Sequence, residues 1–424
     1  MTVGELRLYN NLEFADLSNI ALVQKQLLER HIDYCLNNSP FYKKNIKDGT
    51  DFSQLPFTEK SHLEEFNDDF LAVAPNKIVD IVMSSGTTGK ATKIMYTEND
   101  LARLAYNERI SFEGCGITDE DVVLLTCTID RCFIAGLAYF SGLRALGAAT
   151  IRNGHGTMTS HLQVIKSHKP TVIVGVPAFV RKLAHFLTLN GVEPYSSSVK
   201  KIICIGEPLR DQDMNMLKVA LDLENLWGAK VFSTYASSET ITTFCECTQQ
   251  MGGHLHPDLA VLEIVDEHGN NVGPGRTGEV VLTPLQIEGM PLLRFKTGDI
   301  SFIIEEKCAC GRSSIRLGPV LGRKKQMLKI KGTTVYPQAV FSAVSEIDGI
   351  EDYYIEVRSE DLSDRISVYV SLTGAGEFSV DSVSEYLQSR LRVRPDLYIE
   401  DRIKLREKVY SPESRKPIRF FDKR

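Results

Sequence analysis

Hydrophobic and polar positions follow two alternating periods along the first 240 residues. Apolar side chains recur at helical spacing over residues 17–36, whereas the apolar run at residues 171–176 has the length of a buried strand. The same pattern predicts helices at residues 100–112, 134–146, 161–167, 179–190 and 211–221, and strands at residues 121–127, 148–151, 200–205 and 230–235. Strands that alternate with helices of this length indicate βαβ units and a parallel sheet, so we predict an α/β fold.

From about residue 260 the pattern changes to strand, turn, strand. Apolar runs at residues 262–266 and 278–283 enclose a polar turn at residues 267–271, and Gly273-Pro274-Gly275 forms another turn. This part is therefore predicted to be rich in antiparallel strands.

The last hundred residues have α+β character. They begin at the basic run Arg323-Lys324-Lys325 and combine helices at residues 336–347 and 380–391 with strands at residues 352–357 and 366–372. Because 424 residues exceed what one hydrophobic core usually supports, we expect more than one domain. We predict a large domain at residues 1–322, with its β-rich part at about residues 245–322, and a small domain at residues 323–424.

Composition excludes several classes of protein. The net charge of −6 gives no general attraction to nucleic acid or to an anionic membrane, and no segment approaches the ~20 apolar residues of a membrane span. The first residues lack the apolar core of a signal peptide, so we expect a cytoplasmic protein. Nine cysteines are too few for a disulfide scaffold, and five scattered ones are expected to be buried thiols: Cys35, Cys115, Cys127, Cys132 and Cys204.

A loop rich in hydroxyls and glycine follows the apolar run at residues 79–83. Its sequence, SSGTTGK at residues 84–90, concentrates backbone N–H groups, hydroxyls and one ammonium, which together suit a polyphosphate. It departs from the Walker pattern because Gly86 and Gly89 are separated by two residues and Ala91 follows Lys90. Taken alone, the loop is equally well interpreted as a flexible surface turn.

Four further segments occur downstream: YASSET at residues 235–240, RFKTGD at 294–299, LGRKK at 321–325 and SRK at 414–416. Each alone is typical of a turn or a solvated charge. In this order, the five segments resemble the adenylate-forming superfamily of acyl-CoA synthetases, peptide-synthetase adenylation domains and luciferases. The chain is most similar to the phenylacetate-CoA ligases of that superfamily.

The resemblance implies an ATP site. The loop at residues 84–90 would hold the β- and γ-phosphates of ATP and position pyrophosphate as the leaving group. Its hydroxyls, amides and ammonium come from Ser85, Thr87, Thr88, Gly89 and Lys90. Tyr235 would stack on adenine rather than serve as a core aromatic, next to Ala236 and Ser237. Relatives usually carry Gly at position 236 and Thr at position 238.

The remaining roles come from the same resemblance. Ser238 would contact the α-phosphate or the substrate carboxylate, Glu239 would bind Mg²⁺, and Asp299 would accept both ribose hydroxyls. Arg323 would contact the ribose or its phosphate, and Lys416 would neutralise charge during adenylation.

Three other segments complete the expected site. Lys325 falls at a hinge about which the small domain takes two orientations. In phenylacetate-CoA ligases, Glu207 and Pro208 correspond to a turn that borders the adenine and substrate pocket. The apolar segment at residues 133–139 corresponds to part of the acyl pocket.

Clustered cysteines and histidines indicate a metal site. Thiolates and imidazoles in two groups favour a closed tetrahedral zinc site over buried thiols; the candidates are Cys245, Cys247, His254, His256, Cys308 and Cys310. The resemblance selects Cys247, His254, Cys308 and Cys310, with Cys245 and His256 as alternates. Four protein ligands leave no position for substrate, so this zinc is expected to be structural.

The expected function is that of an ATP-dependent ligase that converts an arylacetic or similar hydrophobic acid into its CoA thioester through an acyl-adenylate. The expected cofactors and substrates are ATP, which leaves as AMP, together with Mg²⁺, CoA and structural Zn²⁺. The alternative is an adenylate-forming enzyme that passes its acyl or adenylyl group to a carrier protein or another cofactor. A regulator with a vestigial nucleotide site is the non-enzymatic alternative, and the resemblance also admits a homodimer.

Overall fold

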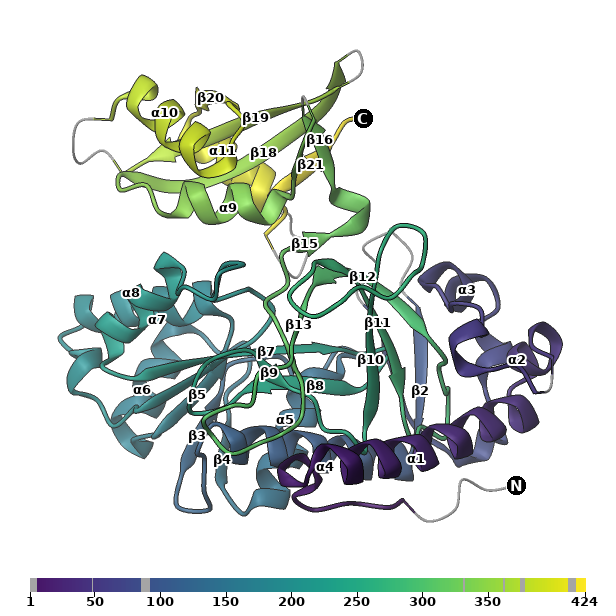
Figure 1. The fold of residues 1–424 in the computed structure, drawn as a ribbon. Coiled ribbons are helices and arrows are strands. Elements are labelled where there is room, and N and C mark those ends of the chain that lie inside the picture. Colours follow the sequence, from purple (N-terminus) through teal and green to yellow (C-terminus); the bar gives the residue numbers. More distant parts are fainter. Residues whose placement is uncertain are drawn as a thin grey trace. The chain divides into compact units, whose positions relative to one another are not determined.

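The computed structural model describes residues 6–47, 49–84, 92–330, 332–360, 363–373, 378–410 and 417–424. The chain divides into two compact units, Met1–Val320 and Leu321–Arg424 (Figure 1). Six residues with predicted roles in the ATP site lie outside the described residues: Ser85, Thr87, Thr88, Gly89, Lys90 and Lys416.

A large mixed sheet forms the centre of the first unit. Its described strands run in the order β13, β14, β9, β8, β7, β6, β5, β3 and β4. The parallel part consists of β4 (Ala149–Arg152), β3 (Val122–Leu125), β5 (Val172–Gly175), β6 (Lys201–Cys204) and β7 (Lys230–Ser237). The antiparallel extension consists of β8 (Thr242–Glu246), β9 (Gly253–His254), β14 (Arg316–Leu317) and β13 (Ile303–Ile304).

Helices cover both faces of the parallel part, as is typical of α/β folds. One face packs against α6 (Met158–His168), α7 (Pro177–Leu189) and α8 (Lys218–Trp227). The other packs against α4 (Glu98–Gly114) and α5 (Ile134–Leu146). The predicted α/β architecture is therefore confirmed, and the helix predicted at residues 134–146 has the bounds of α5.

The helix predicted at residues 211–221 is wrong at residues 211–217, whereas residues 218–221 are helical. The Asp211 carboxylate accepts the N–H groups of Asp213 and Asn215, so a local turn replaces the first helical turns. The helix α8 begins only at Lys218 and continues to Trp227.

The rest of the first unit packs beside this sheet. An antiparallel sheet contains β10 (Ala260–Val265), β11 (Gly278–Pro284) and β12 (Phe295–Ser301), which agrees with the β-rich texture of the sequence. A hairpin of β1 (Ile78–Met83) and β2 (Lys93–Thr97) shares a core with α1 (Leu17–Asn38), α2 (Pro40–Asn45) and α3 (Lys60–Glu65). Short 3₁₀ helices occupy Leu12–Phe14, Phe52–Gln54, Asn67–Phe70, Pro75–Lys77 and Pro194–Ser196.

The second unit has its own hydrophobic core. Its principal sheet runs in the order β20 (Asp396–Ile399), β19 (Ser363–Leu372), β18 (Ile350–Glu360) and β21 (Phe420–Asp422). The helices are α9 (Pro337–Ser345), α10 (Val380–Leu391) and α11 (Arg402–Val409). The unit also contains β15 (Gly322–Arg323), a 3₁₀ helix at Lys324–Gln326, and the hairpin of β16 (Leu328–Ile330) and β17 (Thr333–Val335).

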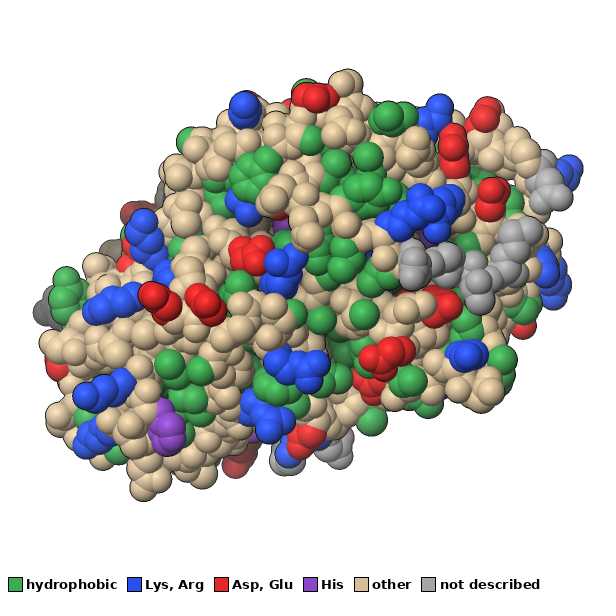
Figure 2. Space-filling model, turned by 90° about the horizontal axis from the view of Figure 1, so that it is seen from below, with side chains coloured by type: hydrophobic (Ala, Val, Ile, Leu, Met, Phe, Trp, Pro, Cys, Tyr) green, Lys and Arg blue, Asp and Glu red, His purple; other side chains and the backbone are tan. Residues whose placement is uncertain are grey.

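Basic and acidic side chains are interspersed on the face drawn in Figure 2, in keeping with the small net charge. Among the described helices, none combines the length and the apolar composition that crossing a bilayer requires.

Candidate active site

The carboxyl edge of the parallel sheet gathers several residues of the predicted site. In open α/β sheets, ligands bind at this edge. Tyr235, Ala236 and Ser237 are the last residues of β7, which is two residues longer than the strand predicted at residues 230–235. A tight turn then leads into β8, and Ser238 and Glu239 lie in that turn.

Tyr235 and Asp299 are in direct contact although 64 residues separate them. The Tyr235 hydroxyl donates a hydrogen bond of 2.9 Å to Oδ2 of Asp299, which lies in β12. Burial raises the pKa of Tyr235 well above its usual value, and the charge of Asp299 raises it further, so the phenol remains a neutral donor. The structure thus brings together the residues predicted to contact adenine and ribose.

Glu239 makes an ion pair that the sequence did not predict. The Nζ atom of Lys60, the first residue of α3, lies 3.1 Å from Oε1 of Glu239. Both side chains are largely buried, with exposed fractions of 22% for Lys60 and 11% for Glu239. Lys60 is therefore a further candidate site residue; its position in the chain, 179 residues from Glu239, carries no signal of this contact.

The partly buried carboxylate of Glu239 suits Mg²⁺, which prefers oxygen ligands, and Lys60 fixes its orientation. The neighbouring Ser238 is held through its carbonyl oxygen, which accepts a hydrogen bond of 2.7 Å from the Tyr96 hydroxyl.

Residues that flank the predicted phosphate loop are buried polar groups. The Ser84 N–H donates to the carbonyl oxygen of Thr92 at 2.9 Å, which closes the base of the loop. The hydroxyls of both residues are buried and have no hydrogen-bond partner among the described residues. The base of the loop therefore carries two hydroxyls that a ligand or the adjoining loop residues could satisfy.

Glu207 and Pro208 follow the end of β6, which pairs in parallel with β7. They therefore lie at the same edge of the sheet as Tyr235. Glu207 also accepts the N–H of Ala178, near the start of α7, at 3.3 Å. Arg323 belongs to β15, in the second unit.

The predicted acyl segment forms the start of α5, with Gly136 and Tyr139 buried. This helix packs tightly against the loop after β3. A Cβ atom on Gly136 would lie 2.2 Å from the carbonyl oxygen of Thr128, so only glycine fits there.

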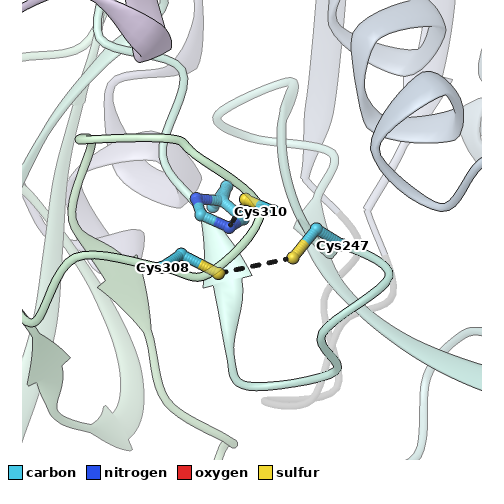
Figure 3. Close-up of side chains that lie close together, drawn as sticks. Cys247, Cys308 and Cys310 are labelled. Atoms are coloured by element: carbon cyan, nitrogen blue, oxygen red, sulfur yellow. Dashed lines mark hydrogen bonds between the residues drawn. The ribbon is translucent and has the colours of Figure 1, made fainter.

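Four predicted zinc ligands converge in the antiparallel extension of the sheet. The ligand atoms of Cys247, His254, Cys308 and Cys310 all lie within 4.8 Å of one another, and Figure 3 shows the three cysteines around one point. The Sγ atoms of Cys247 and Cys308 are 3.6 Å apart, close to the ~3.8 Å edge of a tetrahedron with Zn–S bonds of ~2.3 Å. The donor set therefore fits zinc.

The surroundings of these ligands also suit a metal. Burial, with the charges of Arg312 and Arg316, lowers the pKa of His254 to about 3, so its imidazole is neutral as a metal ligand must be. Although burial alone would raise the pKa of Cys310, hydrogen bonds that include those from Arg312 lower it overall and favour the thiolate.

The alternates Cys245 and His256 do not join this cluster. Cys245 points into the core, where its Sγ lies 3.3 Å from that of Cys115. The His256 Nε2 lies 3.4 Å from the Ser111 hydroxyl. The structure therefore selects the same four residues as the resemblance.

A comparison with protein families identifies the chain. The protein-family model described as "AMP-binding enzyme" matches residues 20–287. The chain belongs to the AMP-binding enzyme family. This AMP-binding enzyme is 30% identical to the phenylacetate-CoA ligase of Thermus thermophilus over 380 residues, which cover 85% of the chain and 83% of that relative. It is 25% identical to the phenylacetate-CoA ligase of Escherichia coli over 85% of the chain and 84% of the relative.

Solved structures support the same fold. A crystal structure of 2-hydroxyisobutyryl-CoA ligase, in the postadenylation state with R3-HIB-AMP, matches the AMP-binding enzyme with a TM-score of 0.82 at 20% identity, covering 100% of this chain and 95% of that chain. The matches confirm the resemblance to phenylacetate-CoA ligases, and with it the assignment to the AMP-forming acid-CoA ligases.

Proposed function

We propose that the protein activates an arylacetic or similar hydrophobic carboxylic acid. In the first half-reaction, a carboxylate oxygen attacks the α-phosphorus of ATP, an acyl-adenylate forms and pyrophosphate leaves. In the second, the CoA sulfur attacks the acyl carbonyl carbon, the thiol proton is released and AMP leaves. The contact between Tyr235 and Asp299, in a chain similar to phenylacetate-CoA ligases over most of its length, carries this proposal.

The described residues have separate roles in this reaction. Asp299 accepts the ribose hydroxyls and Tyr235 stacks on adenine, while their mutual hydrogen bond fixes both side chains. Glu239 would hold Mg²⁺, which would supply positive charge at the phosphates. Lys60 keeps the Glu239 carboxylate in place. The β- and γ-phosphates are proposed to be held by the loop residues Ser85, Thr87, Thr88, Gly89 and Lys90. Lys416 is proposed to neutralise charge during adenylation.

The zinc is proposed to be structural. Cys247 follows β8 and His254 lies in β9, while Cys308 and Cys310 belong to the loop between β13 and β14. A metal held by these four residues would tie the outer strands to β8, whose preceding turn carries Glu239. Elemental analysis of the purified protein should find about one zinc per chain.

An exchange assay tests the first half-reaction. With phenylacetate, the protein should exchange labelled pyrophosphate into ATP without CoA, and Asp299→Asn should slow this at subsaturating ATP by about 10-fold or more. The exposed Glu267→Gln serves as the matched control. Absence of exchange with phenylacetate and with a panel of aromatic and fatty acids would overturn the proposal.

A second assay identifies the acceptor. AMP release that depends on both phenylacetate and CoA supports the proposed ligase, whereas exchange without CoA consumption supports transfer to a carrier protein or another cofactor. We also propose a cytoplasmic homodimer; light scattering and cell fractionation test these two points.

A further inference from the structure

A cavity of about 390 Å³ lies apart from the residues assigned to adenine, ribose and Mg²⁺. It is lined by residues 128–131, which follow β3, and by residues 152–156, at the end of β4 and beyond it. The parallel order is β7, β6, β5, β3, β4, so the cavity is three to four strands from β7. At about 4.8 Å per strand, that separation is roughly 14–19 Å along the carboxyl edge of the sheet.

The cavity is positively charged. Arg131 and Arg152 line it, against a single carboxylate from Asp130, and His155 adds an imidazole. Two guanidinium groups offer planar pairs of donors that match the oxygens of a phosphate group. This lining favours a phosphorylated ligand over an apolar acid.

Arg152 is held in place by its surroundings. Its guanidinium lies over the Phe140 ring of α5, 4.8 Å from the ring centroid. The next residue, Asn153, accepts a hydrogen bond from the Ser160 hydroxyl and contacts Nδ1 of the buried His161 at 2.9 Å. Arg152 is exposed, and the stacking of its guanidinium on Phe140 positions it.

The part of the cavity lined by residues 128–131 is connected to the predicted phosphate loop. Arg131 and Cys132 both have left-handed backbone conformations, with φ of 61° and 55°, which are uncommon for residues other than glycine. The Cys132 carbonyl oxygen accepts the N–H of Met83, the last residue of β1, at 2.9 Å. This strained turn thus joins the cavity to the strand that leads into the loop at residues 84–90.

We propose that this cavity binds the phosphorylated nucleotide end of CoA. The inference rests on the proposed function, because CoA is the second phosphorylated substrate of that reaction. About twelve bonds separate the CoA sulfur from its pyrophosphate, and at ~3.5 Å per three bonds the extended arm spans on the order of 14 Å. A nucleotide at the cavity could therefore deliver the thiol to an acyl-adenylate near β7. Arg131 and Arg152 bind its phosphate oxygens.

The test uses Arg131→Gln, Arg152→Gln and the double variant, with Arg144→Gln as the matched control on the exposed end of α5. Loss of charged hydrogen bonds to phosphate should raise the KM for CoA by about 10-fold or more in the double variant. Pyrophosphate exchange without CoA should remain within about twofold of the wild-type rate, which also shows that the variants fold. Titration calorimetry with CoA and with 3′-dephospho-CoA should show a loss of affinity in the same variants.

Two negative results are distinguishable. Normal exchange combined with an unchanged KM and affinity for CoA in the double variant would overturn this inference alone. If the wild-type protein neither exchanges pyrophosphate with any acid nor binds CoA, the proposed function fails as well.

Discussion

Replacement of Glu108 by Gln should stabilise the first unit at neutral and alkaline pH. Glu108 lies in α4, is only 2% exposed, and accepts a hydrogen bond from the Thr243 hydroxyl. The facing helix α5 presents Gly142, where a Cβ atom would lie 2.3 Å from Cβ of Glu108, so the helices leave no room for water. Burial raises the pKa of Glu108 from 4.5 to about 7, and the Thr243 hydrogen bond offsets only part of that effect.

The direction in which stability changes with pH follows from proton binding to Glu108. Because the folded state holds the Glu108 proton more tightly than the unfolded state, its contribution is most favourable below pH 4.5 and is lost as the pH rises to about 7. A pKa difference of about 2.5 corresponds to about 3.4 kcal/mol, at about 1.36 kcal/mol per pH unit. Between pH 5 and pH 8 the expected loss is about 2.5 kcal/mol. Gln keeps an acceptor for Thr243 and carries no charge at either pH.

The assay is urea unfolding followed by tryptophan fluorescence. Trp227 is the one tryptophan of the chain and is fully buried in α8, so its emission reports on the first unit. The stability of Glu108→Gln relative to wild type should rise by about 2.5 kcal/mol from pH 5 to pH 8. Glu113→Gln, at a partly exposed position of the same helix, is the matched control. A pH-dependent difference below about 0.5 kcal/mol would show that burial does not govern Glu108 ionisation.

Three further changes test the site and its support. Lys60→Gln removes the ammonium that pairs with Glu239 and should slow pyrophosphate exchange by about 10-fold or more. Lys60→Arg should retain part of the rate. Cys308→Ser removes one of the clustered thiols; elemental analysis should show loss of zinc, and the free energy of unfolding should fall by at least about 3 kcal/mol. Gly136→Ala forces a Cβ against the Thr128 carbonyl oxygen and should cost about 1–3 kcal/mol in urea unfolding.

Each change has a control at a position without that contact. Lys77→Gln should leave exchange unchanged. Cys132→Ser should retain zinc, because Cys132 is exposed on the loop after β3; the buried thiol that the sequence predicted at this position is wrong. Gly273→Ala has no atom within 4 Å of the added Cβ and should keep wild-type stability. Equal effects of a test variant and its control would contradict the corresponding argument.

Apolar spacing predicted a helix correctly where nearby residues in the sequence also determine the ends of that helix. The helix α5 combines an apolar sequence with Gly147, whose φ of 95° closes the helix as few other residues can. The failure at residues 211–217 has the converse cause, because the side-chain turn of Asp211 competes with the helix in a way that apolar spacing does not record. Element boundaries therefore depended on particular polar side chains.

The site itself was predictable only where motifs mark it. Tyr235, Glu239 and Asp299 could be proposed as site residues because they stand in short recognisable segments. The candidate Lys60 was missed, since only its contact with Glu239, 179 positions away, marks it. The fold supplies the physical reason for Cys247 over its alternate Cys245: strand alternation directs Cys245 into the core toward Cys115, whereas Cys247 lies beyond the end of β8.

Arg294 connects two parts of the candidate site that lie far apart in the sequence. Its buried guanidinium makes hydrogen bonds of 2.9 and 3.1 Å to the Glu263 carboxylate, and it donates to the carbonyl oxygens of Ser53 and Leu55. Hydrogen bonds between the backbones of Thr58 and residues 294 and 296 continue this contact along the start of β12. The segment that ends in Lys60 is thereby fixed to the strand that carries Asp299, so Lys60 beside Glu239 and the proposed acceptor for ribose are held by one hydrogen-bonded support. Because this support is buried and charged, it orients the site rigidly, and loss of either partner would leave an uncompensated charge in the core.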